Sequence, residues 1–258
     1  MDITKNSTIL ITGATSGIGL AFAERLLAAG STVIVCGRRQ ALLDEIKARH
    51  PQIITRRADV ASARERVALR DWAVSEYPQL NVVINNAGIQ RHVGADFAVD
   101  EPWEDTWSEI EINVGGVVHL SKLFLPHLRT VERPAIVNVT SGLSFVPRAD
   151  VAVYCASKAA VHSFSVSLRH LESTRPRPDG AAAVRVIEVV PPAVNTDLGG
   201  PGLHDFGEPL DAYADSVIAD LAAGKDTSYY GFSGKLASLP SSGEEWDKAF
   251  TMLNSLGK

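Results

Sequence analysis

The chain has 258 residues, of which 45% are hydrophobic and 21% are charged, and its formal net charge is −5. This length suits one α/β domain, with two small domains as the alternative. The mild acidity and the scattered Lys and Arg residues exclude a nucleic-acid patch and argue against membrane binding. Residues 1–7 are polar and no run of about 18 apolar residues occurs, so we expect neither a signal peptide nor a membrane span.

Cysteine and histidine usage bears on location and metals. Cys36 and Cys155 lie far apart and the seven histidines show no ligand spacing. We therefore expect a reduced, cytoplasmic location and assign no metal site.

Short runs rich in Val and Ile alternate with longer stretches of helical periodicity. This alternation is typical of βαβ units, and nearly continuous Val and Ile indicate strands covered on both faces. The predicted strands are Thr8–Thr12, Thr32–Cys36, Ile53–Arg56, Val82–Asn85, Ile136–Thr140, Val184–Val190 and, more weakly, Ser228–Phe232. We expect one α/β domain over residues 1–258: a Rossmann-type, doubly wound parallel sheet of about seven strands with helices on both faces.

Helix signals fill the gaps between these strands. Ile18–Ala29 ends at Gly30, a suitable C-terminal stop, and Ser62 with Glu65 predicts a capping box for a helix that runs to about Tyr77. Apolar residues recur at helical spacing over 103–128, and Gly115 and Gly116 interrupt them, which predicts tight packing or a distortion there. A second amphipathic helix covers about 154–171, followed by a loop over 173–180.

The first predicted strand runs into Thr12-Gly13-Ala14-Thr15-Ser16-Gly17-Ile18-Gly19 and then into a helix. Glycines here permit a tight turn and close approach of the backbone to a pyrophosphate, and the helix start supplies free N–H groups. A plain glycine-rich turn is the alternative, and the position between a strand and a helix favours dinucleotide binding.

The second predicted strand ends in Gly37-Arg38-Arg39, where dinucleotide folds that prefer NAD carry an acid for the ribose hydroxyls. Two guanidinium groups instead suit a 2′-phosphate through charge-assisted contacts. The alternative is a solvated helix start, although Arg is not the favoured charge at a helix N-terminus. We expect NADP(H) to be favoured over NAD(H).

Tyr154-Cys155-Ala156-Ser157-Lys158 places a phenol and an ammonium four residues apart, on one face of a helix. Free tyrosine has a pKa of about 10, and a nearby cation lowers it toward a value suited to acid–base work. By itself, such a pair is usually found on a solvated surface.

The chain resembles the short-chain dehydrogenase/reductase family over nearly its whole length, in the motifs Thr12–Gly19, Asn85-Asn86-Ala87-Gly88, Asn113, Ser141 and Tyr154–Lys158. The resemblance implies that Tyr154 is the general acid/base of an oxidoreductase acting on a carbonyl or alcohol carbon. Lys158 would lower its pKa and hold the nicotinamide ribose. Ser141 would bind the substrate oxygen, and Asn113 would hold a water in a proton relay to Lys158.

The resemblance also assigns a cofactor site: Gly13, Thr15, Ser16, Gly17, Ile18, Gly19, Arg38, Arg39, Asp59, Val60, Asn86, Ala87, Gly88, Tyr154, Lys158, Val194 and Thr196. Asp59 would accept from the adenine amino group. Asn85 either braces the sheet or contacts the cofactor. The chain departs from the family's usual Pro-Gly at Pro191-Pro192, where proline cannot copy a glycine turn, yet Thr196 still matches a carboxamide contact. The double proline and Cys36–Arg39 resemble the DltE-like subgroup, whose name establishes no substrate.

By the same resemblance, the substrate would lie under three loops with a mainly apolar lining that suits a small or medium carbonyl compound: Ile89, Gln90 and His92; Leu143, Phe145, Val146 and Arg148; and Leu198, Leu203, His204 and Phe206. Arg148 would either meet an acidic substrate or be solvated. Cys155 is interpreted as a packing residue. Helices 103–128 and 154–171 resemble those that pair in a homodimer or homotetramer. The alternatives are a sugar-nucleotide epimerase or dehydratase and a non-catalytic NADP(H) sensor.

Overall fold

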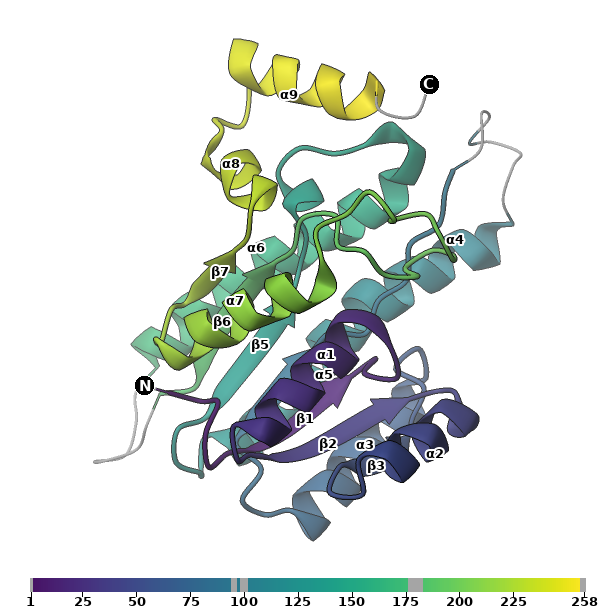
Figure 1. The fold of residues 1–258 in the computed structure, drawn as a ribbon. Helices are drawn as coiled ribbons and strands as arrows, with labels where there is room; N and C mark the ends of the chain where they lie inside the picture. The colour runs from purple at the N-terminus through teal and green to yellow at the C-terminus, as the bar shows by residue number, and fades with distance from the viewer. Residues whose placement is uncertain (1, 94–96, 98–101, 176–182, 256–258) are drawn as a thin grey trace.

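The computed structural model describes residues 2–93, 97, 102–175 and 183–255 (Figure 1). Its parallel sheet has seven strands in the order β3-β2-β1-β4-β5-β6-β7, which confirms the predicted fold class. The strands are β1 Thr8–Thr12, β2 Thr32–Gly37, β3 Ile54–Arg57, β4 Val82–Asn85, β5 Ala135–Val139, β6 Arg185–Val190 and β7 Thr227–Tyr229. Their ends differ from the predicted ones by a few residues, most at β7.

The helices follow the strands in alternation. They are α1 Gly17–Ala28, α2 Gln40–Arg49, α3 Ala63–Glu76, α4 Trp103–Ile110, the π-helical η1 Glu111–Gly115, α5 Gly116–Leu128, α6 Ala152–Thr174, α7 Leu210–Ala222, α8 Phe232–Ser238 and α9 Glu244–Ser255, with the 3₁₀ turns η2 Gly142–Ser144 and η3 Ala149–Val151. Among the described residues, no helix is long and apolar enough to cross a membrane.

Helices cover both faces of the sheet, with α1 and α7 on one face and α3, α5 and α6 on the other (Figure 1). The strands supply both cores because successive side chains point to opposite faces. Ile9 and Ile11 of β1 therefore belong to the core under α1, and Leu10 belongs to the core under α3 and α5.

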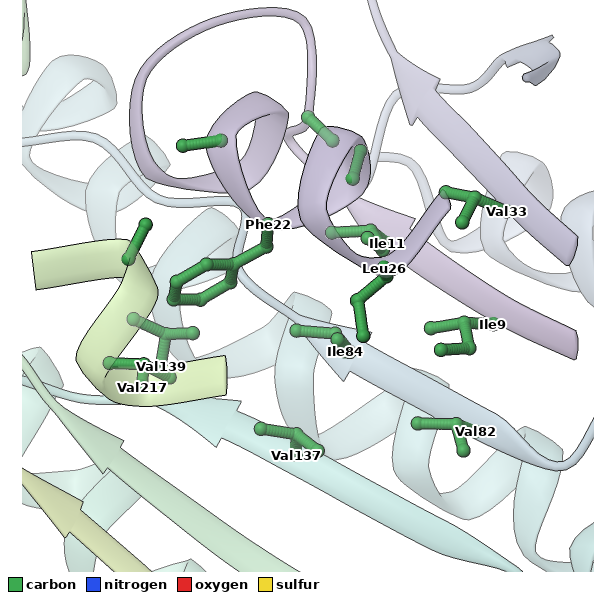
Figure 2. Packing of buried hydrophobic residues seen from close by; sticks show 14 of the residues in the cluster. Ile9, Ile11, Phe22, Leu26, Val33, Val82, Ile84, Val137, Val139 and Val217 are labelled. Atoms are coloured by element: carbon green, nitrogen blue, oxygen red, sulfur yellow. The ribbon is translucent and has the colours of Figure 1, made fainter. Parts of the chain in front are cut away.

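Phe22 of α1 anchors the first of these cores (Figure 2). Its ring is fully buried and lies 6.1 Å, centroid to centroid, from that of Tyr213 in α7. Burying a side chain of this kind stabilises the fold by roughly 1.5–3 kcal/mol. This packing fixes α1, and with it the loop that leads into it from β1.

Two local predictions are changed by the structure. Ser62 accepts a hydrogen bond from Glu65 N, as predicted, but the Glu65 carboxylate accepts from Asp59 N rather than completing a capping box. Ser173 and Thr174, predicted as loop, form the last residues of α6, and 176–180 lies outside the described residues. Asp59 lies only six residues before Glu65, so its N–H competes locally for the carboxylate that a capping box would use.

Candidate active site

The glycine-rich segment lies at the carboxyl edge of the sheet, between β1 and α1. Gly13 and Gly17 have φ values of +64° and +55°, a region that favours glycine. A Cβ on Gly13 would lie 2.5 Å from Ala87 Cα, so the loop packs directly against the segment after β4. The close approach of these two backbones explains the glycine.

Thr12 and Asn86 hold these two segments together. Thr12 Oγ1 accepts hydrogen bonds from Asn86 N and Ala87 N, both at 3.0 Å. Asn86 Nδ2 donates back to Thr12 O at 2.9 Å and to Gly13 O at 3.2 Å. Asn85 braces the sheet, because its Nδ2 donates to Ser121 and Asn138. The sequence left that choice open and missed the part played by Thr12.

Both arginines after β2 line the same cavity as the glycine-rich loop. Arg39 Nη2 donates to Thr15 Oγ1 at 3.0 Å and to Ser16 Oγ at 3.3 Å. Arg38 is exposed, and its carbonyl accepts from Arg57 Nε. Arg39 is exposed at the start of α2 and also contacts the glycine-rich loop, so the choice between a phosphate ligand and a solvated helix start stays open.

Asp59 and Val60 follow β3 on the same side of the cavity. The Asp59 carboxylate accepts from Ala61 N at 2.9 Å, which orients it, and Val60 O accepts from Arg66 Nη1 at 2.6 Å. Both residues line the cavity. Their neighbour Gly116 lies so close that a Cβ there would be 3.4 Å from Val60 O.

The cavity has a volume of about 960 Å³ and runs along the carboxyl edge of the sheet from Arg38 to Tyr154. It brings together every predicted cofactor residue except Val194: Gly13, Thr15–Gly19, Arg38, Arg39, Asp59, Val60, Asn86–Gly88, Tyr154, Lys158 and Thr196. Leu42, Glu45 and Arg49 of α2 also line it, and sequence reasoning missed them because α2 carries no family motif.

Tyr154 and Lys158 line the far end of this cavity. The side chain of Ser141 lies close enough to Tyr154 to lower the pKa of its phenol, against the larger effect of burial. Lys158, one helical turn along α6, places its Nζ 5.6 Å from the centroid of the Tyr154 ring and donates to Val139 O at 2.8 Å. Ser141 Oγ also accepts from Leu143 N at 3.1 Å, which fixes the hydroxyl at the end of β5.

Burial has the largest effect on the pKa values of Tyr154 and Lys158, at this end of the cavity. It raises the pKa of Tyr154 above the ordinary range, and the hydrogen bond with Ser141 acts in the opposite direction. It lowers the pKa of Lys158 to about 8. On balance the pKa of Tyr154 is raised, because removing the phenolate from water outweighs nearby favourable interactions. The expectation that Lys158, together with a bound nicotinamide, lowers this pKa stays a prediction.

Asn113 lies in the π-helical turn η1, which confirms the predicted distortion near Gly115 and Gly116. Its Nδ2 donates to Ile89 O at 2.9 Å and Ser157 Oγ at 3.0 Å, and its Oδ1 accepts from Ile89 N at 2.9 Å. Both amide protons are thus used within the protein, and the side chain positions the segment after β4. The water relay stays a prediction.

The double-proline segment is held by a short bridge. Val194 pairs with Glu208, Asn195 N donates to Glu208 O at 2.9 Å, and Glu208 N donates to Ala193 O at 2.8 Å. Val194 is buried in the core and does not line the cavity, whereas Thr196 does. The segment therefore reaches the cavity through Thr196 without a glycine at Pro192.

The residues of the predicted substrate loops lie in different surroundings in the fold. Phe145 and Val146 pack with α8 and α9 rather than around a substrate, because Trp246 and Asn254 of α9 donate to Phe145 O and Pro147 O. Helix α9 lies above the loop that carries Phe145 and Val146 and packs against it (Figure 1).

Other loop residues fall into three groups. Ile89, Gln90 and Leu198 line the cavity, and Leu143 packs with Leu198 against Tyr154. Arg148 is partly exposed and is bound by Asp150 at 2.6 and 3.0 Å, and Asp150 also lies 3.4 Å from His92. Three residues lie near the surface: Leu203, His204 and Phe206.

Cys155 is buried and burial raises its pKa to about 11, which agrees with a packing role.

The chain is similar to known oxidoreductases over most of its length. The short chain dehydrogenase family model matches residues 7–204. The uncharacterized oxidoreductase DltE of Bacillus subtilis (strain 168) is 50% identical over 226 residues, covering 85% of this chain and 86% of that protein. The NADP-dependent 3-hydroxy acid dehydrogenase YdfG of Salmonella typhi is 34% identical, covering 71% of each.

A solved structure has the same fold. The short chain dehydrogenase from Burkholderia cenocepacia J2315, in complex with NADP, superposes with a TM-score of 0.76 at 26% identity, covering 92% of this chain and 93% of that one. The family match extends from the glycine-rich loop past the Tyr154 helix to the loops after β6. The chain therefore belongs to the short-chain dehydrogenase family of oxidoreductases.

Proposed function

We propose that this protein is an NADP(H)-dependent oxidoreductase that interconverts a carbonyl compound and its alcohol, with Tyr154 as the general acid/base. One observation carries the proposal. Tyr154 and Lys158 line one end of the cavity that also contains the glycine-rich loop, and the Ser141 side chain acts there on the pKa of Tyr154. Proton transfer and dinucleotide binding thus share one site.

The residues present fit a dinucleotide. Ser16 does not cap α1 with its side chain, so the N–H groups of the first turn remain available for a pyrophosphate. Gly17 leaves room for close approach, since the nearest side-chain atom to a Cβ there is Thr196 Cγ2 at 3.5 Å. Asp59 would accept from the adenine amino group, and Lys158 would hold the nicotinamide ribose.

Tyr154, Ser141 and Lys158 each have a part in protonating the substrate oxygen. When bound, a reduced nicotinamide would supply the hydride for the carbonyl carbon and would become oxidised. Tyr154 donates its proton to the carbonyl oxygen, and its raised pKa keeps the phenol protonated for that step. Ser141 donates a hydrogen bond to the same oxygen, and Lys158 stabilises the phenolate that remains. Together these groups convert a ketone or aldehyde, a hydride and a proton into an alcohol.

The preference for NADP(H) rests on Arg38 and Arg39. Both line the cavity next to Gly37, where an NAD-preferring fold carries an acid. Arg39 is already held on Thr15 and Ser16, so its guanidinium is ordered before a phosphate arrives. The NADP-dependent relative and the NADP complex support this preference.

The test is turnover of NADPH with a panel of aldehydes, ketones and keto acids, followed by nicotinamide absorbance, with cofactor binding measured separately by fluorescence. We expect NADPH oxidation with at least one carbonyl class, and a rate lower by about 100- to 10,000-fold in Tyr154→Phe. Tight NADPH binding without turnover of any carbonyl would contradict the proposal and support a non-catalytic sensor.

We also propose that the protein assembles as a homodimer, or as a tetramer of dimers, through α4, α5 and α6. Trp103 and Trp107 are stacked at 5.8 Å on α4 and are 67% and 51% exposed. Val166 and Leu171 of α6 are 46% and 60% exposed. A second copy would cover these apolar groups.

A further inference from the structure

Glu188 of β6 is a buried glutamate that the acid–base chemistry described above does not use. It is 1% exposed, and β6 pairs with β5, the strand that leads into Ser141. Burying a carboxyl group is costly unless it is hydrogen-bonded or paired. Glu188 has such partners on two sides: Thr140, which follows β5, and His162 of α6.

These three side chains form a continuous bridge from β5 to α6. Thr140 Oγ1 donates to Glu188 Oε1 at 2.7 Å. His162 Nδ1 lies 2.9 Å from Glu188 Oε1 and 3.0 Å from Oε2, so it donates to the carboxyl group when Nδ1 carries the proton. The Thr140–Glu188–His162 bridge therefore ties the residue just before Ser141 to the helix that bears Tyr154.

A second contact between α6 and the end of β5 lies beside this bridge. Lys158 Nζ donates to Val139 O at 2.8 Å. Lys158 and His162 are four residues apart on α6, so their side chains share one face of the helix. That face thus holds two consecutive residues of the strand end, Val139 directly and Thr140 through the bridge.

His162 also contacts the segment that follows Ser141. Its ring packs edge-on against that of Phe145, with 4.7 Å between the ring centroids. The flanks of Ser141 on both sides are therefore in contact with one side chain of α6, through the bridge on one side and through this ring contact on the other.

Backbone hydrogen bonds tie the same segment to the sheet. Thr140 N donates to Val189 O, and Gly142 N donates to Pro191 O, both at 2.9 Å. These bonds fix Ser141 relative to β6, whereas the side-chain bridge fixes it relative to α6. Loss of the bridge would leave the strands paired and would change the separation between Ser141 and the phenol on the helix.

We propose that Thr140, Glu188 and His162 are positioning residues that set the separation between the Ser141 hydroxyl and the Tyr154 phenol. The proposal rests on the proposed function, because this separation matters only if both groups act on one substrate oxygen. Geometry of this kind affects rate strongly, since a misplacement of about 1 Å can cost roughly 100-fold.

The test is the single-turnover rate of carbonyl reduction at saturating NADPH and substrate. Thr140→Val keeps the shape of the side chain and removes its donor, whereas Thr140→Ser keeps the hydroxyl. We expect Thr140→Val to lower the rate about tenfold and Thr140→Ser to stay within about twofold of the wild type. NADPH affinity should be close to that of the wild type in both variants. A loss of NADPH affinity that matches the loss of rate would overturn the proposal, because Thr140 would then act on the cofactor.

A Ser141→Ala background separates positioning from a general loosening of the fold. If Thr140 acts through Ser141, Thr140→Val should lower the rate in the wild type and have little effect once the Ser141 hydroxyl is absent. The same factor in both backgrounds would overturn the proposal.

The other end of the bridge gives a second pair of variants, which decides if Thr140→Val does not fold. His162→Leu removes the donor and should lower the rate as Thr140→Val does, while His162→Gln keeps a donor for Glu188 and should retain the rate. His170→Leu is the matched control, because His170 is exposed on the same helix, and it should also retain the rate. Equal rates in His162→Leu and His162→Gln would overturn the proposal.

Failure of this proposal and failure of the reductase function give different results. A wild type that reduces no carbonyl contradicts the reductase function, and the positioning role with it. A wild type that reduces a carbonyl, with Thr140→Val at the same rate, overturns the positioning role alone.

Discussion

The methyl group of Thr15 occupies the space that a side chain at residue 37 would need. A Cβ on Gly37 would lie 2.6 Å from Thr15 Cγ2, while the Thr15 hydroxyl is bound by Arg39. The absence of an acid after β2 is thus coupled to the glycine-rich loop and to the arginine above it.

The contact between residue 37 and Thr15 predicts how substitutions at Gly37 change the preference between NADPH and NADH. Gly37→Asp alone should weaken both NADPH and NADH, because the carboxylate displaces Thr15 and disturbs Arg39. Gly37→Asp with Thr15→Ser, which removes the methyl and keeps the hydroxyl, should bind NADH and disfavour NADPH by at least about tenfold. The measurement is the ratio of kcat/KM values for the two cofactors. Equal ratios in the single and double variants would refute the steric role of Thr15.

Arg38 and Arg39 should each contribute to NADPH affinity. Arg38→Ala and Arg39→Ala should weaken NADPH by about 10- to 150-fold, from the roughly 1.5–3 kcal/mol of a hydrogen bond to a charged group. NADH affinity serves as the internal control and should change little. Binding by fluorescence titration checks both, and wild-type preference for NADH would show that the arginines do not bind a 2′-phosphate.

Tyr154→Phe should lower the turnover rate by about 100- to 10,000-fold, while cofactor affinity stays close to that of the wild type, because only the transferable proton is lost. Ser141→Ala should also reduce turnover strongly and leave cofactor affinity close to that of the wild type. Single-turnover rates and cofactor dissociation constants separate the two effects. More than a tenth of the rate in Tyr154→Phe would refute the acid/base assignment.

His162 and Glu188 should make stability depend on pH. His162 Nδ1 lies 2.9 Å from Oε1 of Glu188, a 1% exposed residue of β6 that also accepts from Thr140 Oγ1. Its hydrogen bond with Glu188 raises the pKa of His162. A raised folded-state pKa means that the extra stability is complete below the unfolded pKa, about 6.5, and is lost as pH rises through the folded value.

The free energy of unfolding in urea, measured from pH 5.5 to 8.5, should therefore fall with rising pH more in the wild type than in His162→Gln. Glutamine keeps a donor for Glu188 but does not titrate. A difference between the two proteins that is the same at every pH would show that the pair contributes no linkage.

Trp103 and Trp107 should support self-association. Replacing both by Glu should shift the protein to a monomer, because two charges would be buried in the contact. Light scattering after size-exclusion chromatography reports the mass. Phe206→Glu is the control, since Phe206 is 70% exposed outside these helices and its change should leave the mass unaltered. A monomeric wild type would exclude the proposed assembly.

Local sequence determined the parts of this protein that depend on short-range chemistry. Val and Ile runs give strands covered on both faces, and Gly13 and Gly17 take positive φ values that few other residues adopt. The spacing of Tyr154 and Lys158 puts them on one side of α6, and Gly115 with Gly116 marks the π-helical turn. Each of these follows from dihedral preference or helical period.

Tertiary structure decided what depends on surroundings. The sequence placed Phe145 and Val146 at the substrate, but α9, about a hundred residues later, covers them. It gave no sign that Arg39 rests on Thr15, or that Glu109 is buried. Burial raises the pKa of Tyr154, an effect that the sequence did not show, because desolvation is set by every element packed around a group rather than by its neighbours in the chain.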